Sequence, residues 1–170
     1  VRWNEDYEDP KSDVALFNQQ QPVAGEDISI SYLKTLPRAA EPGTTWNYNT
    51  GETNLIGVLV SSATGKSLSD YLSEKLWQPY GMEQDAIWLT GPTGHEISGC
   101  CISASLRDYA RLGEFIRGGA VAGGEAVVPD DWVALATTQK APIGVEGRGY
   151  GYQWWTYDDG SYAAQGIFGQ

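Results

Sequence analysis

The stretch from Pro42 to Thr50, PGTTWNYNT, marks the point where a polar and aromatic N-terminal region gives way to a long helical pattern. Pro-Gly signals a turn. Beyond it, four apolar residues recur at the three- and four-residue spacing that places them on one face of a helix. They are Leu55, Ile56, Leu59 and Val60. The spacing predicts a helix over about residues 51–63, and Gly65 is expected to end it because glycine readily adopts the left-handed conformation of a C-cap.

Similar helical patterns lie on both sides of this segment. Further helices are expected near residues 12–18, over 28–36, over 67–77, from Ser103 or Ser105 to Gly118-Gly119, and over 130–138. Pro37 should stop the second of them, because proline lacks the amide hydrogen that a helix needs. Ser105 and Asp108 have the spacing of a capping box. Asp130 or Asp131 is expected to cap the last helix.

The C-terminal region changes character. Residues 150–157 are aromatic and strand-like, residues 158–161 signal a turn, and residues 162–170 would be the returning strand. A hairpin alone is marginally stable, and the sequence offers no clear candidate for a further strand. We therefore expect one α+β domain, with a helical subdomain over about residues 10–140 and antiparallel strands over about 147–170.

Composition and charge exclude several classes of partner. The 170 residues include 22 acidic and 11 basic side chains, so the formal net charge is −11. Nucleic acids and anionic membranes attract clusters of Lys and Arg, and this chain has none. No run approaches the ~20 apolar residues of a membrane span. The sequence does not identify a compartment, although an acidic surface favours the periplasm or secretion over the cytoplasm.

The two cysteines, Cys100 and Cys101, are adjacent. Neighbouring cysteines are poorly placed for a disulfide, so we interpret them as small buried side chains. No His, Cys and carboxylate cluster has the spacing of a metal site, and no glycine-rich phosphate loop appears. We expect no metal and no cofactor.

Five motifs, in one order, resemble the serine β-lactamase-like hydrolases. PGTTWNYNT looks like that family's PGxxFxYSN. The others are Asn54 to Gly57 with Ala63 to Lys66, Leu76 to Met82 (similar to IxxPLGM), Gly99 to Gly113 (similar to GG…STARDLARxG), and Tyr150 to Trp155 with Gly166 to Gln170. The segment around Tyr7 is most similar to the branch that contains 6-aminohexanoate-dimer (nylon-oligomer) hydrolases and carboxylesterases. The resemblance implies a β-lactamase/transpeptidase-like fold, of which this chain is an incomplete part.

The resemblance also implies a chemistry. The family uses a Ser-x-x-Lys nucleophile, a tyrosine partner and an oxyanion hole. Tyr48 stands at the tyrosine position, where a lysine ammonium would lower the pKa of its hydroxyl. Thr50 replaces the Asn that usually follows, which disfavours a β-lactamase or peptidoglycan peptidase and fits esterase and nylon-oligomer relatives better.

Further site residues follow from the same resemblance. Ala164-Gln165-Gly166 falls on the family's Lys-Thr-Gly or His-x-Gly strand without its basic residue, which disfavours anionic, penicillin-like substrates. The resemblance implies that the backbone N–H of Ile167 is an oxyanion-hole donor, and that Tyr7, Trp155 and Gly166 bind substrate. The acidic residues around Tyr7 are either a solvated loop or a rim that favours an amine-bearing substrate.

The nucleophile is expected outside this chain, because the family's Ser-x-x-Lys precedes the region that Val1 opens. A further segment or a second chain would then complete the fold. Ser31-Tyr32-Leu33-Lys34 spells the motif, but Lys34 lies only 14 residues before Tyr48, and we interpret the match as chance. His95, the single histidine, lies in a loop that we expect to be exposed, and no Gly-x-Ser-x-Gly elbow accompanies it.

Three functions stay open from the sequence. The first is a serine hydrolase of small esters or linear amides that works through an acyl-enzyme. The second is a non-catalytic, truncated relative or binding fragment of the same fold. The third is an acidic, tryptophan-rich binding module, for instance for carbohydrate, which the helical spacing disfavours.

Overall fold

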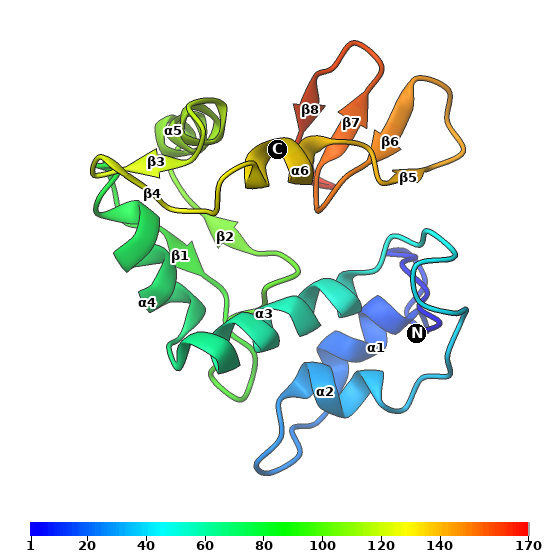
Figure 1. The fold of residues 1–170 in the computed structure, drawn as a ribbon. Helices are drawn as coiled ribbons and strands as arrows, with labels where there is room; N and C mark the ends of the chain where they lie inside the picture. The colour runs from blue at the N-terminus through cyan, green and yellow to red at the C-terminus, as the bar shows by residue number, and fades with distance from the viewer. Residues whose placement is uncertain (170) are drawn as a thin grey trace. The chain divides into compact units, whose positions relative to one another are not determined.

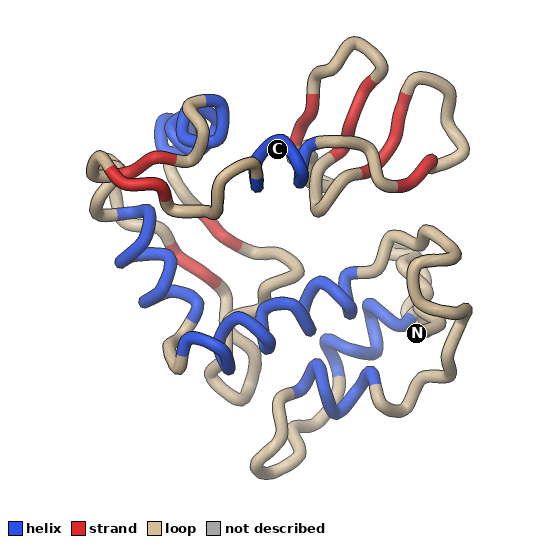
Figure 2. The backbone as a smooth tube through the Cα atoms, viewed as in Figure 1, coloured by secondary structure: helices blue, strands red, loops and turns tan. Residues whose placement is uncertain are grey.

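The computed structural model describes residues 1–169 (Figure 1). They divide into two compact units, residues 1–110 and residues 111–169. Helices dominate the first unit and short strands the second (Figure 2). The division falls within one helix, α5 (Leu106–Arg117). None of the helices in the described part of the chain is long and apolar enough to cross a bilayer.

The first unit contains the four helices that the sequence predicts before residue 80. They are α1 (Asp13–Gln19), α2 (Ile28–Leu33), α3 (Thr50–Thr64) and α4 (Leu68–Leu72), the last continued by the π-helical turn η1 (Ser73–Trp77). Two strands that the sequence did not reveal, β1 (Ile87–Trp88) and β2 (Ile102–Ser103), pair antiparallel. The hydrophobic core is built around Trp3, Phe17 and Tyr32, whose rings meet edge to face at centroid distances of 5.9 to 6.1 Å.

Helix α3 begins and ends where its sequence indicates. The Asn49 side chain accepts a hydrogen bond from the backbone N–H of Glu52 at 2.9 Å, and it caps the helix. Gly65 ends the helix in the left-handed conformation, with φ of 66°. Gly51, in the first turn, lets the helix approach the core closely, because a Cβ there would lie 2.6 Å from the Trp3 ring. The helix is therefore fixed against the core at the end next to Tyr48.

Downstream, serine side chains cap two helices, of which the cap at Ser105 was expected, and the expected cap at Asp131 is wrong. Ser67 caps α4 through a hydrogen bond from Asp70 N, and Ser105 Oγ accepts from Asp108 N at 3.1 Å before α5. The Asp108 carboxylate is fully buried and accepts hydrogen bonds from the backbone of Glu83 and Gln84. Asp131 precedes α6 (Trp132–Thr137) but makes no side-chain capping bond, because its backbone is left-handed, with φ of 62°.

The second unit carries a four-stranded antiparallel sheet in the order β5-β6-β7-β8. Its strands are β5 (Ala141–Pro142), β6 (Arg148–Tyr150), β7 (Trp155–Tyr157) and β8 (Tyr162–Ala163). A separate hairpin, β3 (Val121–Ala122) with β4 (Glu125–Ala126), precedes α6. The expectation that no further strand could be found is wrong, since β5 and β6 extend the sheet (Figure 2).

Two expected strands are shorter than predicted. Residues 150–157 contain the end of β6, a turn and β7, because Gln153 has a positive φ of 67° that reverses the chain. The returning strand ends at Ala163, and Ile167 and Phe168 form a turn instead. Of the predicted strand 162–170, the last residue lies outside the described residues. Gly166 and Ile167 are therefore loop residues that follow the last strand.

The interpretation of the cysteines is also wrong. Cys100 and Cys101 are exposed, and a disulfide joins them. The backbone of Cys101 has a positive φ of 83°, which is uncommon for a residue other than glycine, and it accompanies the disulfide between the two adjacent cysteines. Neither observation could be read from two adjacent cysteines in an apolar segment.

Candidate functional site

Two groups of candidate residues emerge, one in each unit. Tyr7 and Tyr48 lie in the first unit, and Trp155, Gly166 and Ile167 lie in the second. Tyr7 lies close enough to Tyr48 to feel its charge, and Trp155 pairs with Ala163, three residues before Gly166. Each group is described within its own unit.

Glu5 is the centre of the first group. Its carboxylate accepts hydrogen bonds from the Trp3 indole, from the Tyr7 hydroxyl at 2.6 Å, and from both the backbone N–H and the hydroxyl of Thr50. Thr50 is the first residue of α3 and Tyr48 lies two residues before it. The N-terminal loop is thus tied to the start of α3, and Tyr7 is held in the neighbourhood of Tyr48.

The electrostatics of this group keep both tyrosines protonated. Burial, followed by the hydrogen bond to Glu5, raises the pKa of Tyr7 to about 12. Burial raises the pKa of Tyr48 as well, and the negative charge of Glu5 adds to the effect. The resemblance implies a lysine that lowers the pKa of Tyr48, whereas the residues described here act in the opposite direction. With these surroundings Tyr48 stays protonated at neutral pH and is a weaker acid than a free tyrosine.

Glu5 and Thr50 are the members of this group that sequence reasoning did not place. The acidic residues around Tyr7 were expected to share one role, either as a solvated loop or as a site rim. Only Glu5 gathers these partners, whereas Asp6 and Asp9 accept bonds from nearby backbone amides. Thr50, expected only as a departure from the family's Asn, holds Glu5. An acidic residue two positions before Tyr7 was the one available signal in the sequence, and its partner Thr50 lies 45 residues away.

Ser31 and Lys34 do not form a nucleophile and base pair. The Ser31 hydroxyl donates to Glu26 at 2.7 Å, and the Lys34 ammonium contacts both Glu26 oxygens at 2.5 and 2.6 Å. These contacts lower the pKa of the Glu26 carboxyl, the one from Lys34 most. An ammonium neutralised by a carboxylate is a poor base, so the geometry agrees with a chance match.

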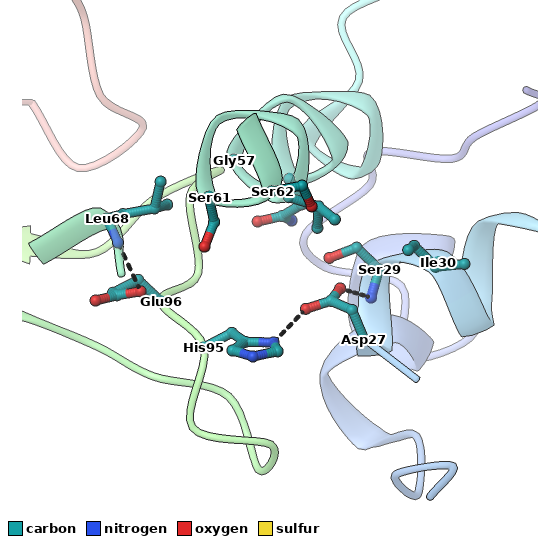
Figure 3. A pocket seen from close by; sticks show the side chains of 11 residues that line it. Asp27, Ser29, Ile30, Gly57, Ser61, Ser62, Leu68, His95 and Glu96 are labelled. Carbon is teal, nitrogen blue, oxygen red and sulfur yellow. Dashed lines mark hydrogen bonds and ion pairs between the residues drawn. The ribbon is translucent and has the colours of Figure 1, made fainter. Parts of the chain in front are cut away.

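A separate polar pocket lies along the second half of α3, within the first unit (Figure 3). Its volume is about 270 Å³, and its polar lining includes Asp27, Ser29, Ser61, Ser62, His95 and Glu96. The His95 imidazole is exposed, as expected, and its Nδ1 lies 2.8 Å from Asp27 Oδ2. Within residues 1–169 no serine hydroxyl bonds to His95, so the dyad lacks a nucleophile.

The second group lies around the end of the four-stranded sheet. The Trp155 ring meets that of Tyr150 edge to face at 5.0 Å. Gly166 and Ile167 follow β8, and no hydrogen bond among the described residues uses the N–H of Ile167. A free backbone donor at this position is consistent with the role that the resemblance implies. Side-chain identity at position 167 offers no test of that role.

One residue of the second group was missed. The guanidinium of Arg148, on β6, donates from Nη2 to Gln165 Oε1 at 3.1 Å and lies 5.2 Å from the Trp155 ring centroid. The sequence-based expectation was that this region lacks a cation, because position 164 is Ala. Arg148 supplies one from a different strand.

Comparisons with known proteins identify the family. The sequence profile of the β-lactamase family matches residues 4–170. The chain belongs to the β-lactamase family. A curated relative, the 6-aminohexanoate-dimer hydrolase of Paenarthrobacter ureafaciens, is 28% identical over 185 aligned residues, which cover 100% of this chain and 47% of the relative. The chain thus spans about half the length of that relative.

Solved structures agree with the family's fold. A structure from Bacillus anthracis, assigned as a 6-aminohexanoate-dimer hydrolase, superposes with a TM-score of 0.75 at 28% identity and covers 84% of this chain and 38% of its own. The octameric penicillin-binding protein homologue of Pyrococcus abyssi matches with a TM-score of 0.54 at 19% identity, over 69% of this chain and 31% of its own. The fold is β-lactamase/transpeptidase-like, with mixed helices and small antiparallel sheets, and this chain forms part of it.

Proposed function

We propose that the protein hydrolyses small esters or linear amides through an acyl-enzyme, with a serine nucleophile outside residues 1–170. The observation that carries the proposal is the position of Tyr48. By resemblance it falls at the family's tyrosine position, and it lies two residues before α3, near Glu5 and Tyr7. The similarity to 6-aminohexanoate-dimer hydrolases supports a linear amide as the substrate class.

In this proposal Tyr48 moves protons. The serine oxygen attacks the carbonyl carbon, its proton passes to the Lys and Tyr pair, and Tyr48 donates a proton to the departing nitrogen or oxygen. Water then attacks the acyl-serine ester and releases the acid. The described residues raise the pKa of Tyr48, which makes its neutral hydroxyl a weaker acid. The abstracting step needs the ammonium of a lysine that the described residues do not supply.

The oxyanion and substrate contacts are assigned to the remaining candidates. The N–H of Ile167 would donate to the carbonyl oxygen as negative charge develops on it. Tyr7, Trp155 and Gly166 would contact the substrate. The substrate is a small molecule, and its hydrolysis by this scheme uses no cofactor.

The alternative is a non-catalytic relative of the same fold. It is favoured by one observation, that Ser31 and Lys34 are both bound to Glu26 and leave no activated serine at the only Ser-x-x-Lys of the sequence.

Intact mass before and after a fluorophosphonate serine probe distinguishes the two, with p-nitrophenyl butyrate hydrolysis followed on the same sample. An adduct outside residues 1–170, together with hydrolysis, is the expected result. Tyr48→Phe should lower kcat/KM by at least ~100-fold, whereas Tyr71→Phe on α4 should not. No adduct and no hydrolysis would support the non-catalytic alternative, and an adduct at Ser31 would overturn the assignment of the nucleophile.

A further inference from the structure

Arg148 is held in a fixed place on the sheet of the second unit. It lies opposite Tyr157 in the pairing of β6 with β7, so both side chains occupy one face. Its guanidinium lies 5.2 Å from the Trp155 ring centroid and 5.5 Å from that of Tyr157. The amide oxygen of Gln165 accepts from Nη2 at 3.1 Å. Stacking and one hydrogen bond therefore orient the planar group before any ligand arrives.

The charge of Arg148 is not neutralised by the described part of the chain. Several other cations have carboxylate partners, namely Lys34, Arg38, Lys66, Arg107 and Arg117. Arg148 forms no ion pair with any carboxylate of residues 1–169, although the net charge of the sequence is −11. Its Nε is buried and has no hydrogen-bond partner there. The Nη1 donors are likewise unused by described residues.

We propose that Arg148 is the centre of a carboxylate-binding site. A guanidinium fork matches the two oxygens of a carboxylate, and hydrogen bonds between the two charged groups are among the strong ones. Because Nε is screened, the carboxylate contacts Nη1 and Nη2. The guanidinium covers one face of the Trp155 ring and one of the Tyr157 ring, so the methylene groups next to the carboxylate would contact the ring edges.

The nature of the anion follows from the surroundings. A single guanidinium carries one charge, and the loop residues Glu146 and Asp158 add negative charge close to β6 and β7. That balance favours a singly charged carboxylate with an aliphatic chain over a phosphate dianion.

The role of the carboxylate rests on the proposed function. Gln165 directly precedes Gly166 and Ile167, the segment assigned to the oxyanion. A carboxylate on Arg148 would therefore lie near the reacting carbonyl, as in a linear amide of an amino acid that ends in a free carboxylate. This reverses the expectation from Ala164 that anionic substrates are disfavoured.

The test is a titration of the protein, labelled with ¹⁵N in Arg and Trp side chains, with sodium hexanoate, hexanamide and inorganic phosphate. Hexanoate should shift the Arg148 Nε–H and the Trp155 indole signals with a dissociation constant in the millimolar range, and hexanamide and phosphate should leave them unchanged. Arg148→Met should weaken hexanoate binding at least ~10-fold, and Arg148→Lys should weaken it less. Lys140→Met is the matched control, because Lys140 lies 5.2 Å from the Tyr152 ring in the same unit; it should bind hexanoate normally.

Several outcomes would overturn the site. The first three are equal signal shifts with hexanamide, tighter binding of phosphate than of hexanoate, and hexanoate binding that persists in Arg148→Met. The fourth is no shift of the Arg148 and Trp155 signals up to ~100 mM hexanoate, which is well above the dissociation constant of ~1–10 mM expected for a single ion-paired contact. The folded state of Arg148→Met is checked by the unchanged Trp signals of the first unit.

The substrate role is tested separately with two p-nitrophenyl esters, one neutral and one ending in a carboxylate. Arg148→Met should raise KM for the carboxylate ester and not for the neutral one. Hydrolysis of both esters with an unchanged KM ratio would refute the substrate role alone. Hexanoate binding without hydrolysis of either ester would refute the proposed function and leave the binding site standing.

Discussion

Glu5 in the first unit and Arg148 in the second are both charged side chains around which candidate residues gather, yet their surroundings differ. Glu5 accepts hydrogen bonds from Trp3, Tyr7 and twice from Thr50, so its own chain uses its lone pairs. Arg148 makes a single hydrogen bond and rests on aromatic faces. The Glu5 carboxylate is fully hydrogen-bonded by its own chain and so stabilises the fold. The Arg148 guanidinium is held in place by aromatic rings but keeps unused hydrogen-bond donors, so it is available to a ligand. The expected effects below follow from this difference.

The largest expected effect is that of Gly151→Ala, in the turn that follows β6. A Cβ at Gly151 would lie 2.2 Å from the carbonyl oxygen of Ala136, and a backbone atom cannot move aside cheaply. We expect the free energy of unfolding to fall by about 3 kcal/mol, measured by urea denaturation. Gly113→Ala is the control, because it lies in α5 with nothing within 4 Å and should raise stability by about 0.5–1 kcal/mol. Equal stability of the two variants would contradict the close packing at Gly151.

Glu5→Gln should have the next largest effect. The new amide NH₂ faces donors, so we expect a loss of about 2 kcal/mol in unfolding free energy. Removal of the charge should also lower the pKa of Tyr48, and that of Tyr7 from about 12, as seen in phenolate absorbance during a pH titration. Unfolded tyrosine titrates near 10, so the stability that Tyr7 contributes is present below that pH and is lost as the pH rises towards 12. Glu8→Gln, which changes an exposed neighbour, should alter neither quantity.

Arg148→Met should destabilise the protein less than Glu5→Gln. The variant keeps an apolar chain on Trp155 and loses the cation–π contacts, for which we expect about 1 kcal/mol. Thermal or urea unfolding of the two variants side by side gives the comparison directly. A larger loss for Arg148→Met than for Glu5→Gln would show that Arg148 is a structural residue, and the contrast drawn here would fail.

The smallest expected effect is that of Glu74→Gln, where both charges are exposed to solvent. Contacts from Lys66 and then Lys75 lower the pKa of Glu74 to about 2. A lowered folded pKa contributes stability above the unfolded value of about 4.3, and this stability is lost as the pH falls towards 2. Between about pH 4.3 and 2, the unfolding free energy of Glu74→Gln should fall slightly less than that of the unmodified protein, and 1 M salt should remove this difference between the two proteins. Glu146→Gln should behave as the unmodified protein at both salt concentrations.

The helices were the predictable part of the fold, because their signals are local. The caps at Ser67 and Ser105 and the glycine at 65 lie within a few residues of the ends that they define. The strands were not predictable to the same degree. Strands β1, β2 and β5 are two residues long, too short for an alternating pattern, and they form only because a distant segment pairs with them.

The candidate site divides in the same way. Tyr7, Tyr48 and Trp155 could be named from motifs, since a motif is a local pattern. Glu5 and Arg148 could not, because their partners lie 45 and 17 residues away. The resemblance implies that a basic residue is missing at position 164, but Arg148 from β6 reaches Gln165, which only the three-dimensional structure reveals.

The N-terminal segment has a mechanical consequence for the loop that leads to Tyr48. Arg2 donates its backbone N–H to Pro37 O at 2.8 Å, and Glu5 binds Thr50, so residues 2–5 hold both ends of this loop. Residues 38–45 between those ends are all exposed. A protease that cuts within 38–45 would leave two pieces, and Glu5 of the first would stay bound to Thr50 of the second. The loop could therefore be opened, lengthened or exchanged while Tyr48 keeps its anchorage.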